Sequence, residues 1–243
     1  MRPVLFRWRG RPIPSYPAML YLGIVAALAA GNALANARGL SGARVYLASV
    51  LLAFPALLGG RLAYVAAHWS AYRIDPHRIW RRSDGGQVTY GALLAVPVSV
   101  PLLAALGLPF ALFWDIGACS LLAAMVFTRV GCVLNGCCAG RPTESRFGLT
   151  LAGVHGVRAR RVPTQLLEAG VAAVLLASSA VLVLRHAPPG TVFAGALAAY
   201  ALGRLVLDAL RERQRRVAGV PALRAVAAVL LAVALWSLLP RVL

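Results

Sequence analysis

The chain has 243 residues, of which 60% are hydrophobic, and its mean hydropathy is +0.75. This apolar content exceeds the roughly 45–50% of soluble domains, so the composition excludes a soluble globular protein and predicts one polytopic membrane domain over residues 1–243. The formal net charge is +18, and every basic residue is arginine. Because the arginines lie between apolar segments, we expect them to meet anionic membrane lipids and not nucleic acid.

The apolar segments predict an all-α integral membrane protein with about seven transmembrane helices, each near the ~20 residues that span a bilayer. In chain order, the spans are expected at about 16–36, at about 43–69, from Gly85 onward, at about 110–130, from Val162 onward, after Gly190, and at about 222–240. Residues 139–162 are the longest polar segment and are expected to form a small extramembrane head. A solvated loop fits this segment equally well.

Arg61 lies near the end of the second span, in the sequence Gly59-Gly60-Arg61. By the expected boundaries it is inside the membrane, where an ionisable residue indicates function. The alternative is that its long side chain reaches the interface. Asp115, in the fourth span, is a lone buried acid that we expect to be paired or neutral, with a structural role.

The segment from Arg129 to Thr143 follows the apolar run that ends at Phe127. It brings an arginine, an asparagine, three cysteines and three glycines to the edge of the hydrocarbon layer. An ionisable side chain at such depth costs roughly 2.5–3.5 kcal/mol on insertion scales and is therefore a hypothesis of a functional site. The glycines allow the backbone to turn tightly and to approach a ligand. We predict that the chemistry of the protein is located here.

Cys132, Cys137 and Cys138 belong to this segment, whereas Cys119 lies in the apolar run before it. Four cysteines in a chain of this length do not indicate a disulfide scaffold. The spacing C-x4-C-C matches no familiar zinc pattern, so we predict neither a metal nor a cofactor. Two interpretations of the clustered thiols stay open: small packing residues in a crowded loop, or reactive thiols that include a disulfide.

Polar side chains also fall on one face of each of two later spans. Gln165 and Glu168 are three residues apart at the start of the fifth span. In the sixth span, a stripe of polar residues runs through Tyr200, Arg204, Asp208 and Arg211. An ion pair between Arg204 and Asp208 at membrane depth favours a functional role over a simple contact between helices. We expect Arg129 and Arg204 to converge on one cavity.

The segment from Arg129 resembles the signature of the prolipoprotein diacylglyceryl transferase family, Arg-x-Gly-Asn-x-x-Asn-Gly-Glu-x-x-Gly. Arg129, Gly131, Asn135, Gly136 and Gly140 match it, whereas Cys132 and Cys137 stand where the pattern has its first Asn and its Glu. The resemblance extends to Tyr16–Tyr21, Gly59–Tyr64, Gly85–Gly91, Val162–Glu168 and Tyr200–Arg211. The arginine-rich N-terminal segment has the outline of a signal peptide, but the similarity at Tyr16 favours a retained first span.

The resemblance implies an enzyme that moves a diacylglyceryl group from phosphatidylglycerol to the lipobox cysteine thiol of a prolipoprotein. It implies four catalytic residues: Arg129, Arg204, Tyr90 and Tyr16. It also implies a set of substrate-binding residues: Asn135, Gly136, Gly140, Arg61, Gln165, Glu168 and Asp208. Of these, Asp208 would hold Arg204 in place, and Glu168 is a candidate base.

Three functional interpretations follow, because the two cysteines depart from the family pattern. The first is a divergent transferase that tolerates them. The second is a family member with another donor or acceptor that uses its cysteines, and the third is an inactive lipid-binding membrane protein. The presence of Arg129, Tyr90 and Arg204 favours the first.

Two criteria predict opposite orientations of the chain in the membrane. Most arginines lie in the N-terminal segment and in the loops after the second, fourth and sixth spans. The positive-inside rule would place that side in the cytoplasm. The resemblance implies the bacterial cytoplasmic membrane with the active site on the outer side, and we follow the resemblance.

Overall fold

The computed structural model describes residues 4–81, 94–152, 157–211, 216–217, 220–221, 228 and 232. Its contacts divide the chain into two compact units. The first comprises Met1–Gly39 and Trp114–Leu243, and the second comprises Leu40–Phe113. The predicted residue Tyr90 lies outside the described residues.

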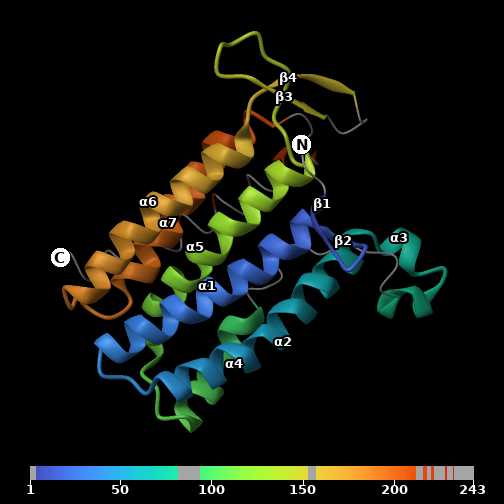
Figure 1. The fold of residues 1–243 in the computed structure, drawn as a ribbon. Coiled ribbons are helices and arrows are strands. Elements are labelled where there is room, and N and C mark those ends of the chain that lie inside the picture. Colours follow the sequence, from blue (N-terminus) through green and yellow to red (C-terminus); the bar gives the residue numbers. More distant parts are fainter. Residues whose placement is uncertain are drawn as a thin grey trace. The chain divides into compact units, whose positions relative to one another are not determined.

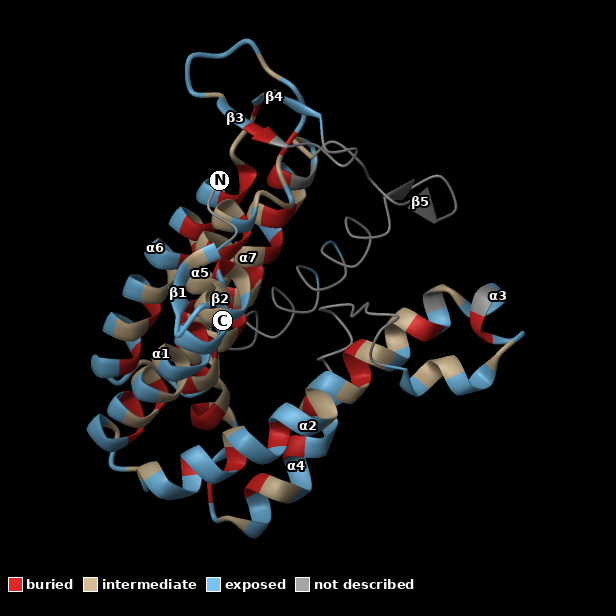
Figure 2. Ribbon diagram, turned by 45° about the vertical axis from the view of Figure 1, so that its right-hand side comes forward, coloured by how far each residue is buried: buried red, intermediate tan, exposed pale blue. Residues whose placement is uncertain are grey.

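Four helices of the first unit run side by side: α1 (Ser15–Ala37), α5 (Phe110–Asn135), α6 (Thr164–Leu184) and α7 (Thr191–Asp208) (Figure 1). Buried residues lie on the faces where α5, α6 and α7 meet (Figure 2). Their core consists mainly of small side chains, namely Ala118, Leu122, Ala172 and Ala196. Small residues allow helices to approach closely, which is how helices associate in a lipid environment that offers no hydrophobic driving force.

Glycines bring α1 against α5. A Cβ atom on Gly31 would lie 2.6 Å from Ser120 Oγ, and one on Gly23 would lie 3.0 Å from the Ala124 carbonyl oxygen. A Cβ on Gly131 of α5 would lie 2.9 Å from Met19 Cβ. A side chain at any of these positions would therefore crowd the contact between the two helices.

The second unit contains α2 (Gly42–Ala67), α3 (Trp69–Tyr72), the 3₁₀ helix η1 (Pro76–Trp80) and α4 (Ala95–Ala105). Arg61 donates hydrogen bonds to the carbonyls of Ile79 (2.9 Å) and Arg78 (3.1 Å), so it ties η1 to the end of α2. Its guanidinium also lies 5.6 Å from the ring of Tyr72, within the range of a cation–π contact. These contacts give Arg61 a structural role that the sequence did not suggest. Its role in substrate binding stays a prediction.

Short strands lie outside the long helices. In the first unit, β1 (Val4–Trp8) and β2 (Arg11–Pro14) form a hairpin before α1, and β3 (Leu149–Ala152) and β4 (Arg158–Arg161) form another within the expected polar head. β5 (Arg216–Val217) pairs with β6 (Val220–Pro221). The β1–β2 hairpin was not predicted. Its turn residues Arg9 and Gly10 both have positive φ, as a two-residue hairpin turn of type I′ requires.

The structure shows a multi-pass helical membrane protein. Within the described residues, α1, α2, α5 and α6 are long and apolar enough to cross a bilayer, and α4 and α7 are shorter apolar helices. The expected fourth span is longer than predicted, because α5 continues through Val130, Val133 and Leu134 to Asn135. The described residues thus contain six apolar helices and not the seven transmembrane helices that were predicted. The expected span at 222–240 and the start of the third span lie almost entirely outside them.

Asp115 has the structural role that the sequence predicted. This α5 side chain is 1% exposed, and its two oxygens accept hydrogen bonds from the backbone amides of Gly190 (2.6 Å) and Phe193 (2.8 Å). It therefore caps the N-terminus of α7 from a neighbouring helix, where a negative charge also faces the positive end of the helix dipole.

We expect Asp115→Ala to lower the free energy of unfolding by about 1–3 kcal/mol, because two buried amides would lose their acceptor. The midpoint of thermal unfolding in detergent micelles measures this change. Ser178→Ala is the matched control, since the Ser178 hydroxyl is exposed and bonds only to carbonyls of its own helix. Equal midpoints for the two variants would contradict the capping role.

Candidate functional site

The carboxylate of Glu168, near the start of α6, joins three arginines from three segments. Its Oε1 accepts hydrogen bonds from Arg204 Nη1 (2.8 Å) and Arg211 Nη2 (2.5 Å). Its Oε2 lies 2.5 Å from Arg129 Nε on α5. Glu168 is only 2% exposed, and a charge so deeply buried is tolerated only when opposite charges pair with it. We refer to Arg129, Glu168, Arg204 and Arg211 as the arginine cluster.

Arg129 has hydrogen-bonding capacity that the cluster does not use. The contact of its Nε with Glu168 has the geometry of an ion pair and not of a hydrogen bond. Among the described residues, its two terminal amino groups make no hydrogen bond, and the side chain is 18% exposed. The outer edge of this guanidinium is thus available to an anionic group.

Arg129 and Arg204 lie together, because both contact Glu168. That they line one cavity stays a prediction. The predicted pair of Arg204 with Asp208 is untested, since the side chain of Asp208 is not described. Arg211 was noted only as the end of a polar stripe. It lies beyond α7, in a β-bridge with Gly140, and still reaches Glu168.

The segment after α5 brings Arg211 close to α6. The amide of Gly140 bonds to the Val162 carbonyl (2.9 Å), and the amide of Arg141 bonds to the Leu210 carbonyl (2.8 Å). The segment therefore lies between β4 and the chain that leaves α7. A Cβ atom on Gly140 would lie 2.7 Å from the Leu210 oxygen and 2.8 Å from the Val162 oxygen. Only glycine fits here, which gives Gly140 a steric role beside its predicted role in substrate binding.

The C-terminus of α5 is a Schellman motif built on Gly136. This glycine has φ 74°, its amide bonds to the Val133 carbonyl, and the Cys137 amide bonds to the Cys132 carbonyl (3.1 Å). The 6→1 bond folds the chain back over the last turn of the helix. Cys137 is consequently placed beside Cys132, although four residues lie between them in the sequence.

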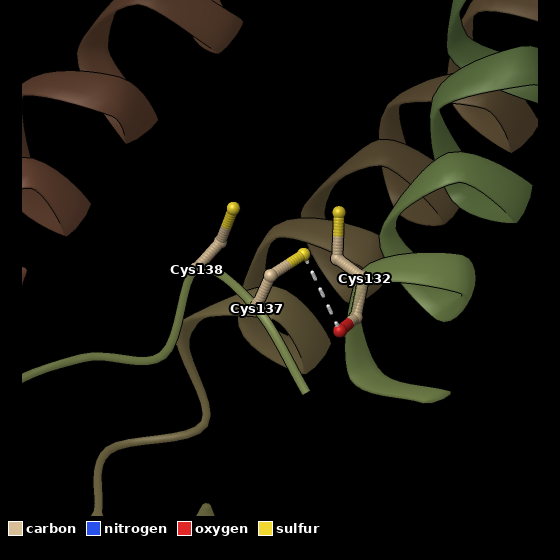
Figure 3. Close-up of side chains that lie close together, drawn as sticks. All are labelled: Cys132, Cys137 and Cys138. Atoms are coloured by element: carbon tan, nitrogen blue, oxygen red, sulfur yellow. Dashed lines mark hydrogen bonds between the residues drawn. The ribbon is translucent and has the colours of Figure 1, made fainter. Parts of the chain in front are cut away.

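Cys132, Cys137 and Cys138 form a thiol cluster at this turn, and all three are free. Their sulfur atoms lie within 4.8 Å of one another, with Cys137 between the other two (Figure 3). Hydrogen bonding by the Cys132 and Cys138 thiols lowers the pKa of Cys137. The sequence predicted no metal site, because it gave no sign that the three thiols converge.

Two α6 residues hold the loop that carries the thiols. Gln165 Nε2 donates to the Cys137 carbonyl (2.6 Å), and Thr164 Oγ1 donates to the Cys138 carbonyl (3.0 Å). Both side chains are almost fully buried. Thr164 was missed by the sequence analysis. The only available signal was its position at the N-terminus of α6, beside Gln165 and one turn before Glu168.

Two further predicted residues lie near the clusters. Tyr16, in the first turn of α1, interacts electrostatically with Arg129 and with the three thiols. Asn135 is the last residue of α5 and is exposed. The structure thus brings Tyr16, Arg129, Asn135, Gln165, Glu168 and Arg204 to one end of the first unit.

We expect Glu168→Gln to lower the free energy of unfolding by about 3 kcal/mol, because it removes the carboxylate that three arginines share. Thermal unfolding in detergent micelles measures the change. Glu144→Gln, at an exposed acid, is the matched control and should leave the midpoint unchanged. A Glu168→Gln protein as stable as this control would show that the ion pairs are not needed for folding.

Gly136→Ala should destabilise the protein by about 1 kcal/mol, because alanine is strained at φ 74°. Gly170→Ala should instead stabilise it by a similar amount, since Gly170 is inside α6 and a Cβ there meets nothing within 4 Å. The thiol crosslinker dibromobimane, which becomes fluorescent when it joins two close thiols, should label Gly136→Ala more slowly than Gly170→Ala. Equal rates would contradict the role of the turn in gathering the thiols.

Comparison with known proteins places these residues in a family. Residues 3–239 match the sequence profile of the family described as prolipoprotein diacylglyceryl transferase. A phosphatidylglycerol–prolipoprotein diacylglyceryl transferase of Clostridium tetani is 30% identical over 88% of this chain and 87% of its own length. The protein of that name from Geobacter sulfurreducens is 31% identical over 86% of this chain and 82% of its own.

Phosphatidylglycerol–prolipoprotein diacylglyceryl transferase 2 of Clostridium perfringens is 32% identical over 61% of this chain, and the match covers 59% of that relative. The profile match extends over nearly the whole chain and includes the arginine cluster and the thiol cluster. The chain therefore belongs to the prolipoprotein diacylglyceryl transferase family.

Proposed function

We propose that this protein transfers a diacylglyceryl group from phosphatidylglycerol to the thiol of a lipobox cysteine in a prolipoprotein. The observation that carries the proposal is the arginine cluster, which puts a partly exposed guanidinium edge at the end of apolar helices. The family and the names of its relatives support the substrate classes.

The reaction is a displacement at carbon. The acceptor thiol gives its proton to water and becomes a thiolate, which is the nucleophile. The thiolate forms a carbon–sulfur bond with the terminal diacylglyceryl carbon, and the bond from that carbon to the phosphate oxygen breaks. The electron pair stays on this oxygen, and glycerol phosphate leaves. The phosphate thus changes from a singly charged diester towards a doubly charged monoester.

The arginine cluster suits a phosphate that gains charge as it leaves. Guanidinium groups bind phosphate oxygens through two parallel hydrogen bonds, and fixed positive charge stabilises the transition state more than the ground state when negative charge increases. Glu168 contacts Arg129 through Nε, which leaves the two terminal amino groups for a ligand. We assign phosphate binding to Arg129, supported by Arg204 and Arg211.

Glu168 is better suited to positioning than to proton transfer. Both of its oxygens already contact guanidinium groups, so neither is left to take a proton from the acceptor thiol. The sequence analysis offered Glu168 as a candidate base. The geometry favours instead a residue that sets the orientation of Arg129 and Arg204.

An apolar groove on the same helices is suited to an acyl chain. Its volume is 390 Å³, and it begins one helical turn from Arg129. Its lining comes from α1, α5 and α6 and consists of Ala26, Ala30, Ala123, Val126, Phe127, Ala173, Leu176 and Ala177. A lipid whose phosphate contacts Arg129 would have this groove within reach of a chain, because Val126 and Phe127 of its lining are two or three residues from Arg129 on α5.

The remaining predicted residues are proposed to contact the headgroup and the acceptor. Gln165 Oε1 is buried and makes no hydrogen bond with the described residues, so it can accept one from a glycerol hydroxyl. Tyr16 and Asn135 lie at the same end of the helices. Roles for Tyr90, Arg61 and Asp208, and for Gly136 and Gly140 in substrate binding, rest on the resemblance.

For the membrane topology we propose seven helices in the bacterial cytoplasmic membrane, with the active site on the outer side. The four long and two shorter apolar helices support a multi-pass arrangement. The arginine-rich loops would then lie against the outer leaflet, where they attract anionic phospholipid.

Arg129→Ala should reduce transfer from labelled phosphatidylglycerol to a lipobox peptide by about a hundredfold or more, because one preorganised charge contact is lost. Arg129→Lys should keep only part of the activity, since lysine is a point charge without the planar two-point contact. Arg185→Ala, at an exposed arginine at the opposite end of α6, is the matched control and should be fully active. Wild-type activity in the Arg129→Lys protein would show that the geometry of this guanidinium is unimportant.

A further inference from the structure

The thiol cluster is the part of the site that the family pattern does not explain. Cys132 and Cys137 replace an amide and a carboxylate of that pattern, and Cys138 follows them. The three sulfur atoms lie within 4.8 Å of one another, close enough to hold one metal ion together. All three thiols are free, so no disulfide uses them.

The spacing of the sulfur atoms is close to that of a metal site. A tetrahedral zinc ion with bonds of about 2.3 Å holds its sulfur ligands roughly 3.8 Å apart. The thiol cluster therefore needs to contract by at most about 1 Å, which side-chain rotation can supply. Thiolate ligands select soft ions, and zinc is the most common of these in tetrahedral sulfur sites.

The backbone around the thiols is already fixed. The Gly136 turn sets Cys137 beside Cys132, and the carbonyls of Cys137 and Cys138 are held by Gln165 and Thr164. Cys138 has φ 64°, a conformation that non-glycine residues rarely adopt. Metal sites depend on such outer contacts to orient their ligands.

The charge of the surroundings favours a metal–thiolate complex. Three thiolates and one divalent ion carry a net charge of −1. Arg129 interacts electrostatically with Cys132 and Cys138, and Arg211 interacts with Cys138. These cations offset the negative charge of the complex at the edge of the apolar helices.

We propose that Cys132, Cys137 and Cys138 bind one zinc ion through three thiolates and leave its fourth position open for the acceptor thiol. Three protein ligands with an open position are the arrangement of catalytic zinc sites, whereas structural sites are closed by a fourth ligand. Cys138 is exposed, so the complex can be reached by a second substrate. This inference rests on the proposed function and names the way in which the acceptor is activated.

The step balances in atoms and charge. The acceptor thiol binds zinc as a thiolate and releases its proton to water, because coordination deprotonates a thiol. Its sulfur then forms the bond to the diacylglyceryl carbon while the bond to the phosphate oxygen breaks, and glycerol phosphate leaves with the electron pair. The thioether product is neutral and a weaker ligand, so it dissociates from zinc. No oxidant or reductant is required.

The first test measures the metal in the full-length protein, purified in detergent with thiols reduced. We expect one zinc per chain by elemental mass spectrometry. We expect cobalt(II), exchanged for zinc, to show sulfur-to-cobalt charge transfer and the visible bands of a tetrahedral site. Addition of a lipobox cysteine peptide should shift the visible bands, and the same peptide with serine in place of cysteine should not.

The variants provide the control. Cys138→Ala changes an exposed side chain and should fold normally. It should lower the affinity for zinc by at least about a hundredfold, because loss of a residue that only orients a metal ligand already costs up to about that much. Cys132→Ala and Cys137→Ala should do the same. Cys119→Ala removes the cysteine outside the cluster and should keep one zinc per chain. Competition with a chromophoric chelator reports these affinities without reference to activity.

The outcomes separate this inference from the proposed function. Full transfer activity in Cys138→Ala and in zinc-free protein would overturn the zinc site and leave the transferase in place. One zinc with a peptide-dependent cobalt spectrum, but no transfer from phosphatidylglycerol, would overturn the proposed donor and keep the thiol-binding zinc site. A disulfide between two of the three cysteines, or binding of copper(I) alone, would also overturn the zinc site.

Discussion

The shared carboxylate of Glu168 is the interaction on which the rest of this site depends. It lies 2% exposed among apolar helices, and it holds Arg129 from α5, Arg204 from α7 and Arg211 from the chain beyond α7. Buried ion pairs contribute little to stability compared with apolar packing of the same volume, because removing charges from water is costly. A cluster of this kind is therefore better explained by what it binds than by what it stabilises.

The first turns of α6 connect the two halves of the site. Thr164 and Gln165 hold the carbonyls of the thiol loop, and Glu168, one turn later, holds the arginines. A movement of α6 along its axis would shift the thiols and the guanidiniums together. The N-terminus of a helix also carries a partial positive charge, so a departing phosphate in this region would meet a second source of stabilisation.

Much of the helical architecture was visible in the sequence, because apolar runs of about 20 residues have few other interpretations. Arg129 and Arg204 were identifiable for the same reason, as charges inside such runs. The end of α5 was misplaced, since the apolar residues continue to Leu134 and only Gly136 stops the helix. The β1–β2 hairpin was missed because its arginine-rich sequence resembled a leader and concealed the turn at Arg9 and Gly10.

The partners within the site could not be predicted, because they depend on tertiary contacts. No spacing in the sequence shows that Glu168 meets Arg129 on a helix almost 40 residues earlier, or that Arg211 reaches the same oxygen as Arg204 after its helix has ended. The thiol cluster was equally hidden. A C-x4-C-C spacing resembles no metal motif in an extended chain or in a continuous helix, and only the left-handed turn at Gly136 makes Cys132 and Cys137 neighbours.

That same turn explains why the two departures from the family pattern belong together. Position 137 donates its amide to the carbonyl of position 132, so the two side chains share one environment and a change in either alters the surroundings of the other. The Asn and Glu of the family pattern would place hydrogen-bonding oxygen and nitrogen atoms at positions 132 and 137. Two cysteines, with Cys138 beside them, replace these polar groups with three polarisable sulfurs, of which Cys132 and Cys138 interact electrostatically with Arg129. The pair of substitutions therefore changes the chemistry of one location as a unit, from an amide and a carboxylate to two thiols, while Arg129 next to it still matches the family pattern.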